Sequence, residues 1–133
     1  MKVRHLLIVL TGNLAALAGA VAGGAERERT YPAIGAIERA DPRFDAIVPA
    51  GAVLEKLAEG FEWSEGPVWN HHGGYLLFSD IPNNAVMRWS PRDGLGLFLK
   101  PSGYTGSIPR GGEIGSNGLL FDSQNRLVLC QHG

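Results

Sequence analysis

One short pattern occurs twice in the second half of this chain and limits its fold more than any other feature. The first copy is residues 65–69, followed by a turn and the apolar run 75–78. A second copy begins about 50 residues later, with residues 117–121, a turn and residues 126–129. In each copy, short β-forming runs alternate with residues that favour tight turns. The pattern predicts two repeats of one small β-unit.

The first repeat extends over four expected strands, which are residues 67–69, 75–79, 85–89 and 95–99. Segment 53–57 before them fits either a short strand or one helical turn. The chain has 19 glycines and 8 prolines among 133 residues, which favours short elements over long helices. Consecutive strands with short links form an antiparallel meander, and a repeated four-stranded meander is typical of a β-propeller blade.

The expected fold class is therefore all-β, with a β-sandwich as the alternative to a propeller. Residues 52–133 would form an incomplete propeller, with a first blade at about 52–100 and the start of a second at 116–133. A propeller has about 4–8 blades, whereas this chain offers about one and a half. Because a half-built blade leaves an open strand edge, we expect an N-terminal fragment of a longer protein.

The N-terminus has the features of a secretory signal peptide over residues 1–25. Lys2 and Arg4 precede an apolar run at 6–10, and small residues continue to Ala25. A short membrane anchor is the alternative, but no long apolar span is present. Residues 26–51 contain three prolines and predict an extended arm. We expect a periplasmic or secreted protein that has no membrane partner after cleavage.

Composition excludes several classes of function. The formal net charge is −1, so the chain lacks the basic footprint of a nucleic-acid-binding protein. A single cysteine excludes an internal disulfide framework and a cysteine-based zinc site.

Glu65 and Asn117 are the strongest candidates for a functional site, because each opens the first strand of its repeat. In a propeller the innermost strands line a central channel, so residues at their starts would converge. Carboxylate and amide oxygens suit a hard cation such as Ca²⁺. The alternative is that both residues belong to exposed turns. Arg110 and Glu113 lie in the long loop 101–116 and would either contact a polar substrate or be solvated.

Other polar residues are expected to have structural roles. His71 and His72 are predicted in a solvated turn, Asp80 as a turn cap, Cys130 as an inert core residue and His132 as a structural polar residue. Four aromatic side chains are expected in the core between sheets: Trp63, Trp69, Trp89 and Phe121.

These motifs together resemble one known family. EGPVW at 65–69, LLFSDIP at 76–82 and RW at 88–89 resemble the opening of the SMP-30/gluconolactonase family. PRGGE at 109–113, SNGL at 116–119 and RLVLCQHG at 126–133 are similar to its secreted bacterial gluconolactonase branch.

The resemblance implies a six-bladed β-propeller with one divalent cation in its channel. We expect Ca²⁺, with Zn²⁺ or Mg²⁺ as alternatives. It also implies hydrolysis of a sugar lactone such as glucono-1,5-lactone, a small-molecule substrate. Glu65 matches the family's metal ligand, and Asn117 is carried over only as a channel-lining residue. The remaining ligands and the general base would come from later blades, so we expect the chain alone to be inactive.

Other functions remain open on these residues. One alternative is a non-catalytic secreted β-propeller that binds a carbohydrate or a protein, since fold does not fix function. A related propeller enzyme acting on phosphotriesters, or one condensing amines with aldehydes, is another. Glu65 favours a metal-dependent hydrolase over the condensing type.

Overall fold

The structure, a computed structural model, describes residues 5–11 and 30–131. The predicted signal peptide therefore lies outside the described residues except for the segment that forms strand β1 (His5–Thr11). His132 also lies outside them. In the described part of the chain, no helix is long and apolar enough to span a membrane. The described residues fall into two compact units, one containing residues 30–58 and the other residues 59–131.

The smaller unit contains a short 3-10 helix, η1 (Pro42–Ala46), and most of strand β2 (Val53–Phe61). Asp41 caps η1 by accepting a hydrogen bond from the backbone N–H of Arg43. Part of the predicted arm is extended, and Ala33 forms an isolated antiparallel bridge with Glu55. β2 also pairs with β1 in a two-stranded sheet. Segment 53–57 is therefore a strand and not a helical turn.

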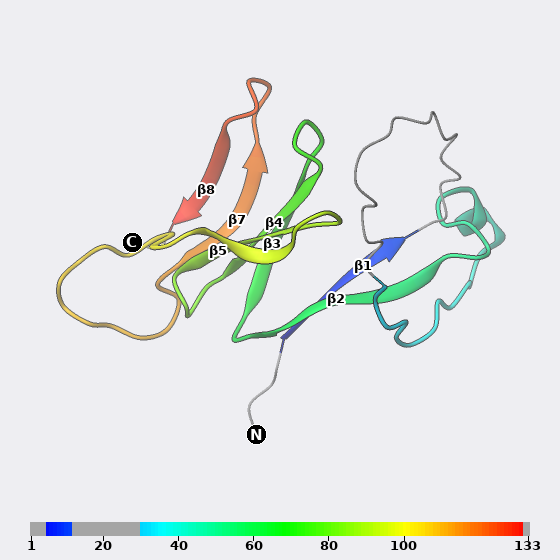
Figure 1. The fold of residues 1–133 in the computed structure, drawn as a ribbon, viewed down its shortest axis with the longest axis horizontal. Coiled ribbons are helices and arrows are strands. Elements are labelled where there is room, and N and C mark those ends of the chain that lie inside the picture. Colours follow the sequence, from blue (N-terminus) through cyan, green and yellow to red (C-terminus); the bar gives the residue numbers. More distant parts are fainter. Residues whose placement is uncertain (1–4, 12–29, 132–133) are drawn as a thin grey trace. The chain divides into compact units, whose positions relative to one another are not determined.

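The larger unit consists of two antiparallel sheets (Figure 1). The first sheet is a meander in the order β3-β4-β5-β6, and the second pairs β7 with β8. The strands are β3 (Ser64–Asn70), β4 (Tyr75–Asp80), β5 (Ala85–Ser90), β6 (Gly94–Leu99), β7 (Ser116–Phe121) and β8 (Leu127–Gln131). The predicted all-β class, the four-stranded meander and its restart after the long loop are confirmed.

Each hairpin turn contains a residue in the left-handed backbone region. Gly74, Asn84, Gly94 and Asn125 have φ angles of 63°, 53°, 74° and 59°. Glycine adopts this conformation without steric cost, and asparagine tolerates it better than other side chains do. The Gly and Asn residues that marked turns in the sequence therefore supply the conformations that hairpins require.

Strand β4 is the centre of the core. It lies between β3 and β5, and the face that carries Tyr75 also packs against β7. All residues of β4 after Tyr75 are therefore buried. Successive side chains of a strand point to opposite faces. On one face Phe78 meets Phe61 edge to face, with ring centroids 4.9 Å apart. On the other face Tyr75 contacts Phe121 of β7.

Three of the predicted core side chains are not buried. Trp63 and Trp69 are each 39% exposed, and Cys130 is exposed. Trp69 pairs with Leu76, so it points to the face of β3 opposite β7. Cys130 lies in a sheet that packs one face against β3 and β4 among the described residues. Trp89 is buried as expected, and Phe121 is half-buried.

Asp93 organises the turn between β5 and β6. Its carboxylate accepts hydrogen bonds from Arg92, Ser90 and Arg88, while its backbone N–H donates to the Ser90 hydroxyl. The Arg92 guanidinium above all holds the pKa of Asp93 at about 2, below its ordinary 3.8.

The lowered pKa of Asp93 predicts a pH effect on stability. A carboxylate with a depressed folded-state pKa stabilises the fold above its ordinary pKa, and this contribution is lost as the pH falls toward about 2. Asp93→Asn should therefore flatten the decline of the unfolding free energy between about pH 4 and pH 2. Urea unfolding of both proteins across that range measures the difference. Parallel curves would contradict the prediction.

Candidate functional site

Glu65 lies beside a β-bulge at the start of β3. It pairs with Ser79 of β4, and the next pair along the ladder is Val68 with Leu77. Two residues of β3, Gly66 and Pro67, therefore face one residue of β4. Gly66 has a φ of 59°, which suits glycine at the first position of such a bulge. A bulge changes the direction of the side chains beside it, and Glu65 directly precedes this bulge.

Strand β7 also contains a bulge near its start. Its register shifts between Ser116 and Leu119, so Asn117 and Gly118 face one residue of β8. When the two strands are aligned at their bulges, Glu65 corresponds to Ser116. The sequence repeat instead matches Glu65 to Asn117, one position later. The turn after β7 holds one residue more than the turn after β3. A single sequence offset therefore cannot match both strands of each repeat.

The two bulges lie against each other. A Cβ atom on Gly66 would lie only 2.2 Å from the backbone oxygen of Asn117, so the two backbones are in direct contact. Ser79 donates a hydrogen bond of 2.9 Å to the same oxygen, and its Oγ lies 2.9 Å from Oγ of Ser116. Both serines are completely buried. The structure thus brings the segments of Glu65 and Asn117 together.

The Glu65 carboxylate is half-buried and partly engaged. Its Oε1 accepts a hydrogen bond of 3.1 Å from the Trp63 indole, and its Oε2 has no partner among the described residues. The indole therefore orients the carboxylate and leaves one oxygen for a ligand. An oxygen of this kind suits a hard cation, but Ca²⁺ takes about 6–8 oxygen ligands. Within the described ranges, no three His, Cys, Asp or Glu residues gather as a metal site.

Asp80 holds the segment that leads to Glu65. It is only 4% exposed, and its Oδ1 accepts hydrogen bonds from the backbone N–H groups of Glu62 and Trp63 at 3.1 and 3.2 Å. Its Oδ2 accepts from Nδ2 of Asn83 at 2.8 Å, which confirms the predicted turn cap. The bonds to Glu62 and Trp63 were not predicted, because they span 18 and 17 residues of sequence.

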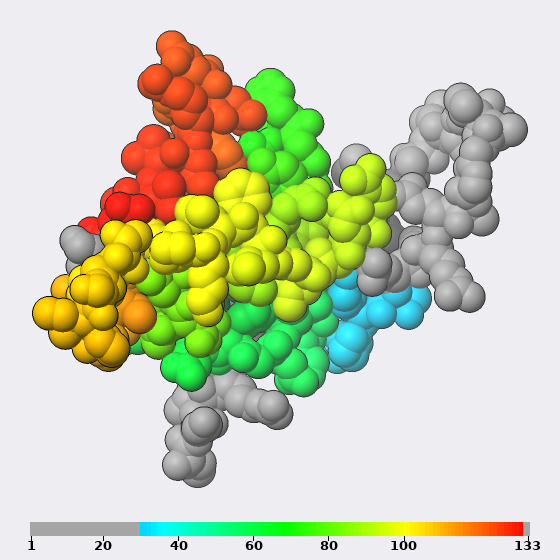
Figure 2. Space-filling model, turned by 60° about the vertical axis from the view of Figure 1, so that its left-hand side comes forward, coloured from blue at the N-terminus to red at the C-terminus, as the bar shows by residue number. Residues whose placement is uncertain are grey.

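Arg110 and Glu113 lie in the long loop between β6 and β7, and both are exposed. The loop projects from the end of the sheets (Figures 1 and 2). Within it the Arg110 guanidinium lies 4.0 Å from the centroid of the Tyr104 ring, and the Tyr104 hydroxyl donates to the Ile108 carbonyl. The loop leads directly into Ser116. Arg110 and Glu113 are therefore attached to the end of the sheets where Glu65 lies.

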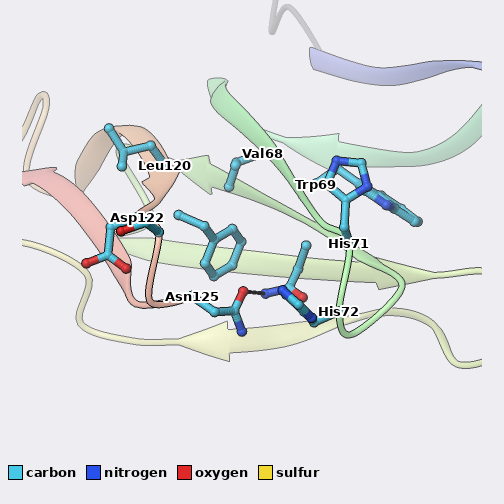
Figure 3. Close-up of a pocket in the computed structure, with 10 residues that line it drawn as sticks. Val68, Trp69, His71, His72, Leu120, Asp122 and Asn125 are labelled. Atoms are coloured by element: carbon cyan, nitrogen blue, oxygen red, sulfur yellow. Dashed lines mark hydrogen bonds between the residues drawn. The ribbon is translucent and has the colours of Figure 1, made fainter.

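A cavity of about 340 Å³ lies at the opposite end of β3 and β7, between the two hairpin turns (Figure 3). Figure 3 shows Leu120 and Asp122 on one side of it and Trp69 and His71 on the other. His71 and His72 are exposed in their turn, as predicted. Their place in the lining of a cavity was not predicted.

The polar atoms of this cavity maintain the turns around it. Asn70 donates to Oδ1 of Asn125 at 3.0 Å and accepts from the Gly73 N–H. Asp122 accepts from two backbone N–H groups and from the Arg126 guanidinium, and these bonds lower its pKa. The side-chain oxygens of Asn70, Asn125 and Asp122 are therefore committed to these turns.

Comparisons with known proteins agree on one family. Residues 63–133 match the family model described as the SMP-30/Gluconolactonase/LRE-like region. A gluconolactonase of Zymomonas mobilis is 42% identical over 102 residues, which are 75% of this chain and 29% of that protein. An X-ray structure of a protein assigned as a gluconolactonase has a TM-score of 0.58 and 33% identity, and covers 78% of this chain. The chain spans about 30% of the length of these relatives.

The contact between the bulges predicts a steric requirement at Gly66. Gly66→Ala should lower the unfolding free energy by about 2–4 kcal/mol, because the φ of 59° strains alanine and the added Cβ meets the Asn117 oxygen. Gly96→Ala is the control, since its Cβ would meet no atom within 4 Å. It should change the unfolding free energy by less than about 0.5 kcal/mol. Equal losses in urea unfolding would contradict the assignment.

Proposed function

The chain belongs to the SMP-30/gluconolactonase/LRE-like family, and on this basis we propose that it is part of a metal-dependent hydrolase of sugar lactones such as glucono-1,5-lactone. One observation carries the proposal. Glu65, inside the matched region, presents a carboxylate oxygen at a bulge that packs against the bulge of the next sheet. We further propose that the two sheets are the first blade and the start of the second blade of a six-bladed β-propeller, with β3 and β7 next to its channel.

The chemistry of Glu65 supports a role in holding a divalent cation. Its carboxylate would supply one ligand, oriented by the Trp63 indole, and we propose Ca²⁺ as the ion, with Zn²⁺ or Mg²⁺ as alternatives. When bound, such an ion polarises an ester carbonyl and stabilises the negative charge that develops on its oxygen. Glu65 would thus anchor the ion, and none of the described residues is assigned as the general base.

The remaining candidate residues would bind the hydroxyl groups of the substrate. A sugar lactone carries several hydroxyl groups that need hydrogen-bond partners once they leave water. Asn117 offers a side-chain amide, Arg110 a guanidinium and Glu113 a carboxylate at the end of the sheets where Glu65 lies. We propose that these three side chains contact the substrate. A sugar lactone in the periplasm or outside the cell would fit the signal peptide proposed for residues 1–25.

The role of Glu65 is testable in a chimera. Residues 30–131 would replace the matching segment of the Zymomonas mobilis gluconolactonase, and acid release from glucono-1,5-lactone would be measured with and without EDTA. Glu65→Gln should lower EDTA-sensitive hydrolysis by more than about 100-fold, since changing even the outer partners of metal ligands costs roughly 10- to 100-fold.

Glu62→Gln provides a matched control three residues away, with an exposed side chain. It should hydrolyse the lactone at the parent rate. The 133-residue chain by itself should be inactive. Hydrolysis that survives both EDTA and Glu65→Gln would overturn the proposed metal-dependent mechanism, and binding of a sugar without hydrolysis would favour a binding module.

A further inference from the structure

Both polar atoms of the Asn84 side chain form hydrogen bonds with the start of the long loop. It lies in the turn between β4 and β5, with a φ of 53°. Its Oδ1 accepts hydrogen bonds from the backbone N–H groups of Ser102 and Gly103 at 2.9 and 2.8 Å. Its Nδ2 donates to the carbonyl oxygen of Tyr104 at 2.7 Å. Three consecutive loop residues are therefore fixed by one amide from a different turn.

The same region fastens the other end of the loop. Gly115 donates its N–H to the Ile81 carbonyl at 2.9 Å, in the turn that contains Asn84. The N–H of Ser116 donates to the hydroxyl of Ser102 at 3.1 Å. Tyr104 and Ile114 are joined by a backbone hydrogen bond of 2.7 Å. Both ends of the loop thus meet at the turn between β4 and β5, and residues 105–113 project beyond this closure.

The packing at this closure leaves little room for movement. Ser102 is completely buried, and its carbonyl accepts a hydrogen bond from the Gln131 amide at 3.1 Å. A Cβ on Gly103 would lie 2.4 Å from the Ile114 oxygen, and one on Gly115 would lie 2.7 Å from the Ile81 oxygen. The loop therefore starts and ends in a fixed geometry, although its tip is exposed.

We propose that Asn84 is a positioning residue that fixes the loop so that Arg110, stacked on Tyr104, is presented to the substrate. This inference rests on the proposed lactone hydrolysis. Asn84 bonds directly to the Tyr104 carbonyl, and the Tyr104 ring carries the Arg110 guanidinium. A planar guanidinium held over a ring keeps its donors in a defined direction, so less conformational entropy is lost when it binds hydroxyl or carboxylate oxygens.

Three substitutions distinguish the effect of the Asn84 side-chain hydrogen bonds from the effect of its left-handed backbone conformation. Asn84→Gly keeps the left-handed backbone accessible but removes all three side-chain hydrogen bonds. Asn84→Asp keeps an acceptor for Ser102 and Gly103, but it places a carboxylate oxygen against the Tyr104 carbonyl in place of the Nδ2 donor. Asn84→Ala removes the hydrogen bonds and also strains the turn.

Trypsin cleavage of the 133-residue chain reports on the loop without depending on any enzymatic activity. Arg110 lies in the loop, and Arg126 in the turn between β7 and β8 is the internal control. Asn84→Gly should accelerate cleavage after Arg110 by about tenfold or more, because three hydrogen bonds no longer hold the closure. Asn84→Asp should accelerate this cleavage less than Asn84→Gly does, because an acceptor for Ser102 and Gly103 remains. Cleavage after Arg126 should not change in either variant.

Steady-state kinetics in the chimera then test the link to the substrate. Asn84→Gly should raise KM by about tenfold with kcat changed less than about threefold, and Asn84→Asp should also raise KM, because it breaks the bond to Tyr104. If Asn84→Gly matches the parent chain in cleavage after Arg110, the positioning role is overturned. Faster cleavage with an unchanged KM would overturn the role in substrate binding. A chimera that is inactive with Asn84 intact would instead contradict the proposed function.

Discussion

The larger unit depends on one close approach between two backbones. Gly66 lies so near the Asn117 carbonyl that even a methyl group has no room, and the buried Ser79 hydroxyl donates to the same carbonyl. A buried carbonyl requires a hydrogen-bond partner, and the left-handed conformation of Gly66 lets β3 bulge at the point of contact. The two sheets are therefore held in register by a polar contact, while Tyr75 and Phe121 add apolar packing nearby. Glu65, next to Gly66, takes its position from this contact.

At this end of the sheets, hydrogen bonds from two short polar side chains hold neighbouring segments of the backbone in place. Asp80 and Asn84 flank one turn, and each satisfies backbone groups from a segment at least 17 residues away in sequence. Asp80 holds the entry to β3, and Asn84 holds the start of the long loop. A buried carboxylate or amide is costly unless its hydrogen bonds are formed. Here the bonds are formed with backbone N–H groups, so one turn fixes two segments at once.

The sequence was sufficient for the strands. Short β-forming runs separated by Gly, Pro and Asn predicted β3 to β8, because these signals are local. It was not sufficient for the tryptophans: Trp69 and Val68 are adjacent and apolar, yet the strand points them to opposite faces and only one face of β3 meets β7. The role of Asn84 was missed for a related reason. Its dipeptide reads as an ordinary turn, and only the fold brings residues 102–104 to its side chain.

The two ends of the sheets differ in which polar atoms already have hydrogen-bond partners. At the end with the hairpin turns, Asn70 bonds to Asn125 of the other turn, while Asn70 and Asp122 also accept from N–H groups of their own turns, so these oxygens mainly maintain the turns. At the other end, Glu65 keeps one carboxylate oxygen without a protein partner among the described residues, while Asp80 and Asn84 satisfy the backbone around it. A ligand gains most from a polar atom that is already oriented and has no competing partner, because little reorganisation is then needed. This difference explains why we place the chemistry at the Glu65 end, although the cavity lies at the other.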